Sequence, residues 1–259
     1  MKNKSRRLVE QILFLTLLVI IWQIVYTLTV DIFEMKKAYS VPSPLGVWES
    51  AIQMLKSNEL FLAIANSMLR CILGFLISVV IGIALGLLIH TCKFLDRNLK
   101  PVVMGVQTLP SICWVPFSIL WFGLEGSAII FVVVMGSAFS LAVAVDSAMR
   151  NINPIYAKVS KTMGADAKSL YLRVIFPACL PNFVSGLRQT WSFAWRALMS
   201  GEVMVTCVGL GTTLQTARDF NDINQVMLVM VVIIILGILI DKVVFSNIEN
   251  TLLKKRGLR

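Results

Sequence analysis

Two charged residues stand inside a stretch of the chain that is otherwise almost entirely apolar. Arg196 and Glu202 lie six positions apart within residues 183–205, a length that favours one long helix. Six positions place two side chains on different faces of a helix, so each needs its own partner or water. A charge inside a membrane is costly, roughly 2.5–3.5 kcal/mol on insertion scales. We therefore weigh two interpretations equally: at least one of the two residues faces a polar cavity, or they form ion pairs between helices.

The other potentially reactive residues are not arranged for catalysis or metal binding. The single histidine, His90, falls at the end of an apolar run, where an interfacial anchor is the expected role. The five cysteines are far apart and indicate small packing residues: Cys71, Cys92, Cys113, Cys179 and Cys207. No Gly-x-x-x-x-Gly-Lys-Ser/Thr loop occurs, so ATP binding in the P-loop manner is not expected. We predict that this chain is not an enzyme and carries no cofactor or metal.

The composition indicates a membrane protein. Of 259 residues, 57% are apolar and 15% are charged, and the mean hydropathy is +0.81. One soluble core cannot bury that much apolar surface. A helix needs about 20 apolar residues to cross the hydrocarbon core, and six runs meet this requirement: 8–30, 67–89, 102–122, 128–145, 183–205 and 226–240, the last extending towards 245. The prediction is an all-α membrane protein with six transmembrane helices.

The third run is interrupted by Pro110 and Pro116, with Trp114 between them. Proline frees backbone carbonyl groups, which are tolerated at membrane depth only where protein or water satisfies them. The pattern indicates either a gate or pathway lining, or a simple kink, and both interpretations stay open. Together with Arg196 and Glu202, these three residues are our candidates for a translocation pathway.

Basic residues lie at alternate ends of the six runs. They precede 8–30, follow 67–89 and 128–145, and close the chain, whereas the intervening connections offset their basic residues with acidic ones. Because Lys and Arg are retained in the cytoplasm, both termini are predicted to be cytoplasmic. The net charge of +10 then needs no nucleic acid to explain it. A cleaved signal peptide is disfavoured, because the first apolar run is too long and no cleavage site follows Val30.

This topology predicts a simple organisation. The parts are an N-terminal tail with the first helix at 1–30, an external connection at 31–66, a core of five helices at 67–248 and a basic cytoplasmic tail at 249–259. Asp146 and Arg188 are expected at the cytoplasmic boundary, where they can reach water.

The longest cytoplasmic connection, residues 151–182, has the local signals of two helices with a break. Pro154 can begin a helix, Gly164 can end it, and Asp166 can cap a second helix that Pro177 is expected to end. The result would be a helical knob that a neighbouring subunit can push.

The spacing of Gly164, Val174 and Pro177 resembles the EAA loop of binding-protein-dependent ABC importer permeases. Glu-Ala-Ala is replaced here by Lys158, Val159 and Ser160, and Phe176 replaces the usual Leu. In the family this loop forms the coupling helix that docks on the cytoplasmic ATPase. The resemblance assigns ATPase coupling to Lys158, Val159, Ser160, Gly164, Ala165, Asp166, Leu170, Val174 and Pro177.

The resemblance extends from about Val41 to the C-terminus. Segments such as LPSICWVPFSILWFGL and AWRALMSGE are similar to the nitrate, sulfonate and taurine branch of these permeases. The resemblance implies a type I importer permease fold in the bacterial inner membrane. It also implies a cytoplasmic ABC ATPase dimer that holds ATP and Mg²⁺, a second permease subunit and an extracytoplasmic solute-binding protein. A homodimer of this chain is the expected permease pair, and a heterodimer is the alternative that stays open.

The resemblance leaves more than one substrate class open, and two other protein classes compete with the permease interpretation. Arg196 suits a small anion such as a sulfonate, taurine, nitrate or bicarbonate; similar permeases carry thiamine-pyrimidine or riboflavin-type precursors. A secondary transporter would be expected to show inverted repeats or proton-relay carboxylates, which the sequence does not show convincingly. An intramembrane enzyme would need a nucleophile with a base, or metal ligands.

Overall fold

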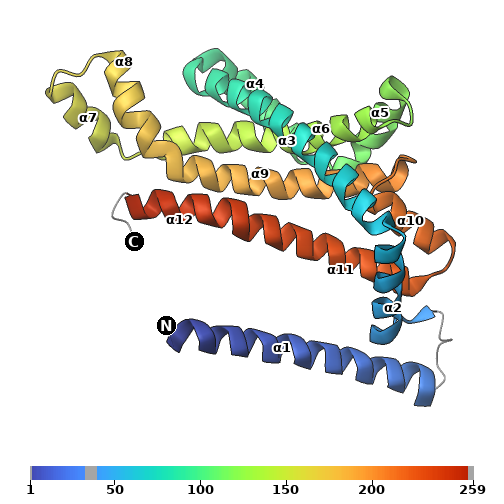
Figure 1. Ribbon diagram of the computed structural model, residues 1–259. Coiled ribbons are helices and arrows are strands. Elements are labelled where there is room, and N and C mark those ends of the chain that lie inside the picture. Colours follow the sequence, from blue (N-terminus) through green and yellow to red (C-terminus); the bar gives the residue numbers. More distant parts are fainter. Residues whose placement is uncertain (1, 33–39, 256–259) are drawn as a thin grey trace. The chain divides into compact units, whose positions relative to one another are not determined.

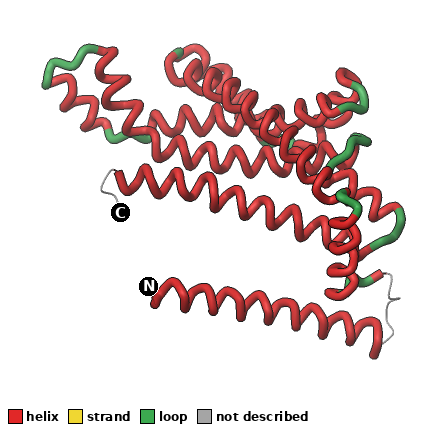
Figure 2. Tube along the Cα trace, in the orientation of Figure 1, coloured by secondary structure: helices red, strands yellow, loops and turns green. Residues whose placement is uncertain are grey.

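The computed structural model describes residues 2–32 and 40–255, and every regular element within them is helical (Figure 1, Figure 2). The all-α prediction is confirmed. Residues 33–39 of the expected external connection and residues 256–259 of the expected basic tail lie outside the described residues. By its internal contacts the chain divides into two compact units, residues 1–64 with 213–233 and residues 65–212 with 234–259.

The first unit holds the N-terminal helices and the beginning of the last long helix. Its elements are α1 (Lys2–Tyr26), η1 (Thr27–Ile32), α2 (Pro44–Lys56) and the first part of α11 (Ile223–Ile240). Ser43 caps α2 by accepting a hydrogen bond from the Gly46 N–H at 3.0 Å, and Pro44 occupies the first turn, where its missing N–H costs nothing. The indole N–H of Trp22 on α1 donates to the Pro42 carbonyl at 3.0 Å, which ties α1 to the chain entering α2.

The second unit holds most of the remaining helices. They are α3 (Glu59–Thr91) from residue 65 onward, α4 (Lys93–Gln107), η3 (Ser111–Trp114), α5 (Val115–Phe122), α6 (Gly126–Arg150), α7 (Pro154–Thr162), α8 (Ala167–Ser169), η4 (Leu170–Ile175), α9 (Phe176–Met204), the start of α10 (Leu210–Asp219), η5 (Asp241–Phe245) and α12 (Ser246–Lys255). Helices α6 and α9 lie along each other (Figure 1). Small residues bring the two helices together: a Cβ atom added to Gly136 would lie 2.7 Å from Ala197 Cβ, and one added to Gly186 would lie 2.8 Å from Ala144 Cβ.

Small residues on α3 let α6 approach closely. A Cβ atom added to Gly82 would lie 2.7 Å from Leu141 Cβ, and one added to Gly86 would lie 2.6 Å from Val145 Cβ. Lipid supplies no hydrophobic force between helices, so such backbone proximity is a main source of packing energy in membranes. The glycine spacing in the sequence predicts this approach, and the structure confirms it.

Within residues 2–32 and 40–255, five helices are long and apolar enough to cross a membrane: Val9–Val30, Glu59–Thr91, Gly126–Arg150, Leu170–Met204 and Ile223–Thr251. A sixth candidate is the pair formed by α4 and the η3–α5 segment, bent by 100° at a short break. The break falls at residues 108–110, as expected for Pro110. The expectation for Pro116 is wrong, because this residue lies in the first turn of α5 and interrupts no helix.

The fifth span differs from its predicted form. It begins at Leu170 instead of residue 183, because α8, η4 and α9 follow one another without a loop. Pro177 was expected to end the second helix of the 151–182 segment, and that expectation is wrong. The wide π turn before it explains why: the Phe176 N–H donates to the Tyr171 carbonyl, five residues back, which shifts the register ahead of the proline.

Candidate functional site

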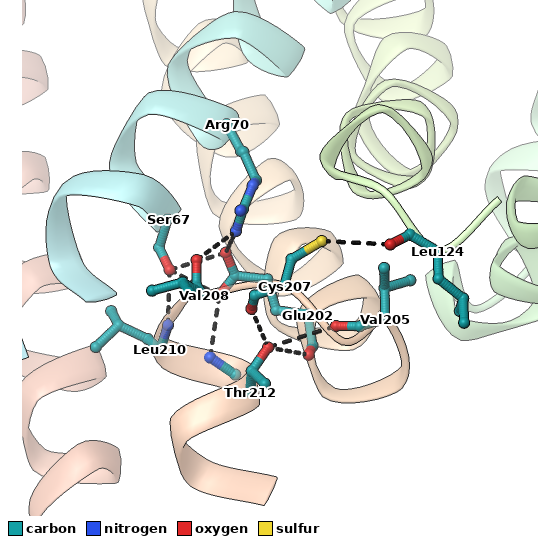
Figure 3. A network of polar contacts seen from close by, with 10 residues as sticks. Ser67, Arg70, Leu124, Glu202, Val205, Cys207, Val208, Leu210 and Thr212 are labelled. Carbon is teal, nitrogen blue, oxygen red and sulfur yellow. Dashed lines mark hydrogen bonds and ion pairs between the residues drawn. The ribbon is translucent and has the colours of Figure 1, made fainter. Parts of the chain in front are cut away.

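Glu202 is fully buried and held by three neighbours (Figure 3). The Ser67 hydroxyl lies 2.8 and 2.7 Å from its two carboxylate oxygens. The guanidinium of Arg70 donates to the same carboxylate at 3.0 Å, as does the backbone N–H of Gly211. A buried carboxylate is stable only with a countercharge and hydrogen bonds, and both are present. The geometry therefore corresponds to the ion-pair interpretation for Glu202.

The same contacts organise the chain after α9. Arg70 also donates to the carbonyl of Val208 at 2.9 Å, and the N–H of Leu210 donates to the Ser67 hydroxyl at 2.8 Å. The Thr212 hydroxyl lies 3.0 Å from the Glu202 carbonyl oxygen (Figure 3). We call Ser67, Arg70, Glu202 and the backbone of 208–212 the Glu202 cluster. It fixes α3, the end of α9 and the beginning of α10 to one another.

Arg196 has a different environment. Its side chain is exposed, its Nε donates to the Ser192 carbonyl at 3.1 Å, and its guanidinium carbon lies 4.7 Å from the ring centre of Phe193. Within the described residues no carboxylate forms an ion pair with it. A cation without a countercharge on a membrane-spanning helix requires water or an anionic ligand.

Arg196 lines a cavity of about 370 Å³, a size within the ~300–1,000 Å³ range of small-molecule sites. The cavity lies between the break after α4 and the middle of α9, and its lining is Gln107, Thr108, Leu109, Pro110, Ser111, Gly136, Phe193, Arg196 and Ser200. The hydroxyls of Ser111 and Ser200, both in the lining, lie 3.3 Å apart and contact each other. We call this the Arg196 cavity.

The five pathway candidates are therefore not all together. Pro110 and Arg196 line the same cavity, whereas Glu202 belongs to the Glu202 cluster. Trp114 ends η3 and lies against Phe117, with ring centres 6.2 Å apart, and Pro116 is exposed in the first turn of α5. The helical break at 108–110 is what brings serine and threonine hydroxyls next to Arg196.

The 151–182 segment has the predicted break. Helix α7 ends at Thr162, and Gly164 follows with a φ of +81°, in the left-handed region, while the N–H of Ala165 donates to the Ser160 carbonyl at 3.0 Å. This six-to-one bond is the Schellman ending that favours glycine. Asp166 caps the next helix as predicted, since its carboxylate accepts from the Ser169 N–H at 3.4 Å. Hydrogen bonding from Ser169 lowers the pKa of Asp166 below its usual value.

The remaining coupling candidates lie around this break. Lys158 and Val159 are exposed on α7 and Ser160 is partly buried, while Leu170 is buried and Val174 and Pro177 are partly buried at the base of α9. The outer helix is thus open to a partner, and the inner residues anchor the segment to the fifth span.

Sequence reasoning missed the partner of Glu202. Arg70 is the only charged residue in the run 67–89, and it complements Glu202 in sign. That isolated charge was a usable signal.

Asp146 is a second missed residue: it lies four residues before the end of α6, but the expectation that its side chain reaches water is wrong. Its side chain is only 1% exposed, and it accepts hydrogen bonds from Lys100 Nζ and Arg150 Nε, both at 2.7 Å. His90 Nδ1 lies 3.4 Å away, and Arg150 also pairs with Asp96 at 2.6 Å. The cations retain Asp146 inside the protein, so it does not turn towards water. Arg188, also expected to reach water, pairs with Asp241 at 2.5 Å.

In the described part of the chain, no group of three or more His, Cys, Asp or Glu side chains could hold a metal ion. The arrangement instead offers a cavity with polar and apolar lining beside α9, the helix that follows the exposed 151–182 segment.

Residues 78–252 match the family model of the binding-protein-dependent transport system inner membrane component. This chain belongs to that family. It is the permease component of an ATP-driven importer in the inner membrane, works with an ATPase and a solute-binding protein, and is not an enzyme.

Curated relatives cover nearly the whole permease. SsuC of Bacillus subtilis strain 168, named for aliphatic sulfonates transport, is 28% identical over 240 residues, 93% of this chain and 85% of the relative. ThiX of Halalkalibacterium halodurans, a formylaminopyrimidine transport permease, is 29% identical over 255 residues, 98% of each chain. NrtB of Synechocystis sp., a nitrate import permease, is 23% identical over 249 residues, 93% and 88% of the two chains.

Solved importer structures have the same fold. The inward-facing methionine transporter MetNI matches with a TM-score of 0.65 and 21% identity, covering 75% of this permease and 96% of that chain. An amino acid ABC transporter with histidines matches with a TM-score of 0.66 and 13% identity, covering 77% and 97%. The predicted type I importer permease fold is confirmed.

Proposed function

We propose that this permease imports a small anion, with the Arg196 cavity as part of its route through the membrane. The observation that carries the proposal is the guanidinium of Arg196, which lines this cavity and has no carboxylate partner among the described residues. Sulfonates and nitrate keep their negative charge at neutral pH, and a guanidinium offers them several N–H donors in one plane. The serine hydroxyls of the cavity lining would supply further donors.

Two relatives support the anionic class, since their names refer to aliphatic sulfonates and to nitrate. The pathway assignment for Pro110, Trp114 and Pro116 rests on their position at and after the helical break. For Glu202 we propose a structural role, because its side chain has no exposed surface and its carboxylate is held by Ser67, Arg70 and the Gly211 N–H.

ATPase coupling would use the exposed face of α7. Ile155, Tyr156, Val159 and Met163 are all at least half exposed and lie on one side of this helix and its end. An apolar face on a short helix outside the spans suits docking into a groove of a partner. ATP and Mg²⁺ would be held by that ATPase, as a dimer beneath two copies of this permease, with both termini in the cytoplasm.

The structure offers a direct route for the coupling. From Ala167 to Met204 the chain is helical without a loop, and Arg196 lies on this helix. Movement of the ATPases on binding ATP would displace α7, and the displacement would reach Arg196 through the helix. In this mechanism the Arg196 cavity is open to the outside first and to the cytoplasm afterwards, and the solute is released when the cavity opens to the cytoplasm.

A formylaminopyrimidine-type solute is the second candidate. ThiX aligns with 98% of each chain, and the Phe193 ring beside Arg196 could stack on a heteroaromatic ring. A secondary transporter is not proposed, because the family depends on a binding protein.

The test is uptake by the complete transporter in proteoliposomes, with its ATPase and binding protein. Labelled taurine, nitrate and formylaminopyrimidine would be offered to the natural permease and to Arg196→Gln and Arg196→Lys. For an anion, we expect Arg196→Gln to lower uptake about 10- to 100-fold, since hydrogen bonds to a charged group contribute ~1.5–3 kcal/mol, and Arg196→Lys to lower it less.

Subunit assembly is checked by size-exclusion chromatography of each variant. Uptake of formylaminopyrimidine without uptake of taurine or nitrate would overturn the anionic assignment. If Arg196→Gln takes up the anion as fast as the natural permease does, Arg196 is not part of the route. Uptake without the ATPase would contradict the coupling mechanism.

A further inference from the structure

Helix α2 carries a row of exposed apolar side chains. Leu45, Trp48, Ile52 and Leu55 are 71%, 67%, 39% and 60% exposed. Their spacing of three, four and three residues places them on one side of the helix. Polar residues Glu49, Gln53 and Lys56 lie beside this row and are also exposed. We call the four apolar residues the α2 stripe.

The opposite side of α2 is anchored to the beginning of α11. Met54 is buried, and its sulfur lies 3.4 Å from the side-chain nitrogen of Gln225. The Ser43 N–H donates to Asn224 Oδ1 at 3.0 Å, and a Cβ atom on Gly46 would lie 2.4 Å from Asn224 Nδ2. This close fit fixes how α2 is rotated about its axis, so the stripe cannot turn inward.

Both ends of α2 are therefore tied to the first residues of membrane-spanning helices. Its N-terminal end contacts α11, which begins at Ile223, and its C-terminal end leads through Ser57 and Asn58 into α3, which begins at Glu59. Asn58 has a φ of +58°, which makes this link a tight turn. Helix α2 must then lie at the level where two spans enter the membrane. Figure 1 shows α2 running across the direction of α1 and α11.

We propose that α2 is an interfacial helix whose stripe inserts into the lipid headgroup and acyl boundary of the leaflet at which α3 and α11 begin. The stripe adjoins the first residues of two membrane-spanning helices, so the lipid boundary is the apolar phase at its level. Tryptophan is enriched at this depth of a membrane, and helices with adjacent apolar and charged sides lie in this plane. Phe61 and Leu62, in the first turn of α3, are 68% and 52% exposed, so the beginning of this span also presents apolar side chains outward.

Site-directed spin labelling of the complete transporter in nanodiscs tests this. Single cysteines at 45, 48, 52 and 55 would be compared with matched cysteines at 49, 53 and 56, in a background whose native cysteines are replaced and whose uptake is intact. We expect stripe labels to be more accessible to oxygen than to a water-soluble nickel complex, and labels at the polar positions to show the reverse.

Equal nickel accessibility at both sets would overturn the proposal, and protection of the stripe from both reagents would show that protein covers it instead. Fluorescence quenching by brominated lipids gives a second measurement. Trp48→Phe should remove a lipid-quenched component of the emission, whereas Trp114→Phe serves as the matched control on another element. Unchanged quenching in Trp48→Phe would contradict the insertion.

Discussion

The guanidinium of Arg70 and the carboxylate of Glu202 lie 3.0 Å apart, although 132 residues separate them in the sequence. Arg70 belongs to α3 and Glu202 to α9, so the pair joins two spans. The Glu202 carboxylate has no exposed surface, and Ser67 and Gly211 complete its hydrogen bonds.

Removing one member of this pair should be much worse than removing both. Arg70→Ala leaves a buried carboxylate without its countercharge and should destabilise the permease by about 3–5 kcal/mol. Arg70→Met combined with Glu202→Leu should recover a large part of that loss. The measurement is the thermal midpoint in detergent, with exposed Arg97→Ala as the control, expected to change stability by less than ~0.5 kcal/mol. Equal midpoints for Arg70→Ala and Arg97→Ala would contradict the ion pair.

Asp146 should be the most sensitive residue at its end of α6. Asp146→Asn removes a buried charge that Lys100 and Arg150 both contact at 2.7 Å, and should cost on the order of 3–5 kcal/mol. Asp96→Asn is the matched control, because Asp96 pairs with the same Arg150 but is one-third exposed, and should cost ~1 kcal/mol or less. Thermal unfolding of the two variants side by side decides the matter. A larger loss for Asp96→Asn would show that the contacts to Asp146 are not the stabilising ones.

Gly164 should tolerate only residues that accept a left-handed backbone. An added Cβ would meet nothing, so space is not the constraint, but the φ of +81° strains an ordinary residue by ~1–2 kcal/mol and excludes proline. We expect Gly164→Pro to abolish ATP hydrolysis stimulated by the loaded binding protein, and Gly164→Asn to retain more of it than Gly164→Ala. Gly105→Ala is the control, since Gly105 is helical and its added Cβ also meets nothing. Normal stimulation in Gly164→Pro would remove the break from the coupling mechanism.

The cap at Asp166 should persist at any physiological pH. Because hydrogen bonding from Ser169 lowers the pKa of this carboxyl, its stabilising effect is complete above the ordinary value of 3.8 and disappears as pH falls through the lowered pKa. Hydrogen exchange at Ser169 should therefore keep its protection from neutral pH down to about the ordinary value. In Asp166→Asn, the protection of the Ser169 amide against hydrogen exchange should not change as the pH is lowered. Loss of protection between pH 7 and 5 in the natural protein would contradict the assignment.

Local signals in the sequence predicted the spans and the break at Gly164 well. Both depend on neighbouring residues: a run of apolar side chains must cross the membrane as a helix, and a glycine after a helical stretch offers the positive φ that ends it. The cap at Asp166 follows the same logic. The glycines at 82 and 86 predicted a close helix contact, although not which helix would make it.

Contacts between distant residues could not be derived in the same way. The charge on Arg70 was visible, but its pairing with Glu202 depends on which spans touch. The burial of Asp146 could not be predicted either, because its three basic neighbours come from α3, α4 and α6. Pro177 does not end a helix, because the π turn before it accommodates the proline, and that turn cannot be predicted from the proline alone.

The contact at Gly82 and Gly86 also limits where a solute can pass. Because α3 meets the side chains and backbone of α6 at distances that leave no space even for a methyl group, no channel can open between these two helices without separating them. They form one wall. The Arg196 cavity avoids this wall, since its lining comes from the break after α4, from Gly136 of α6 and from α9.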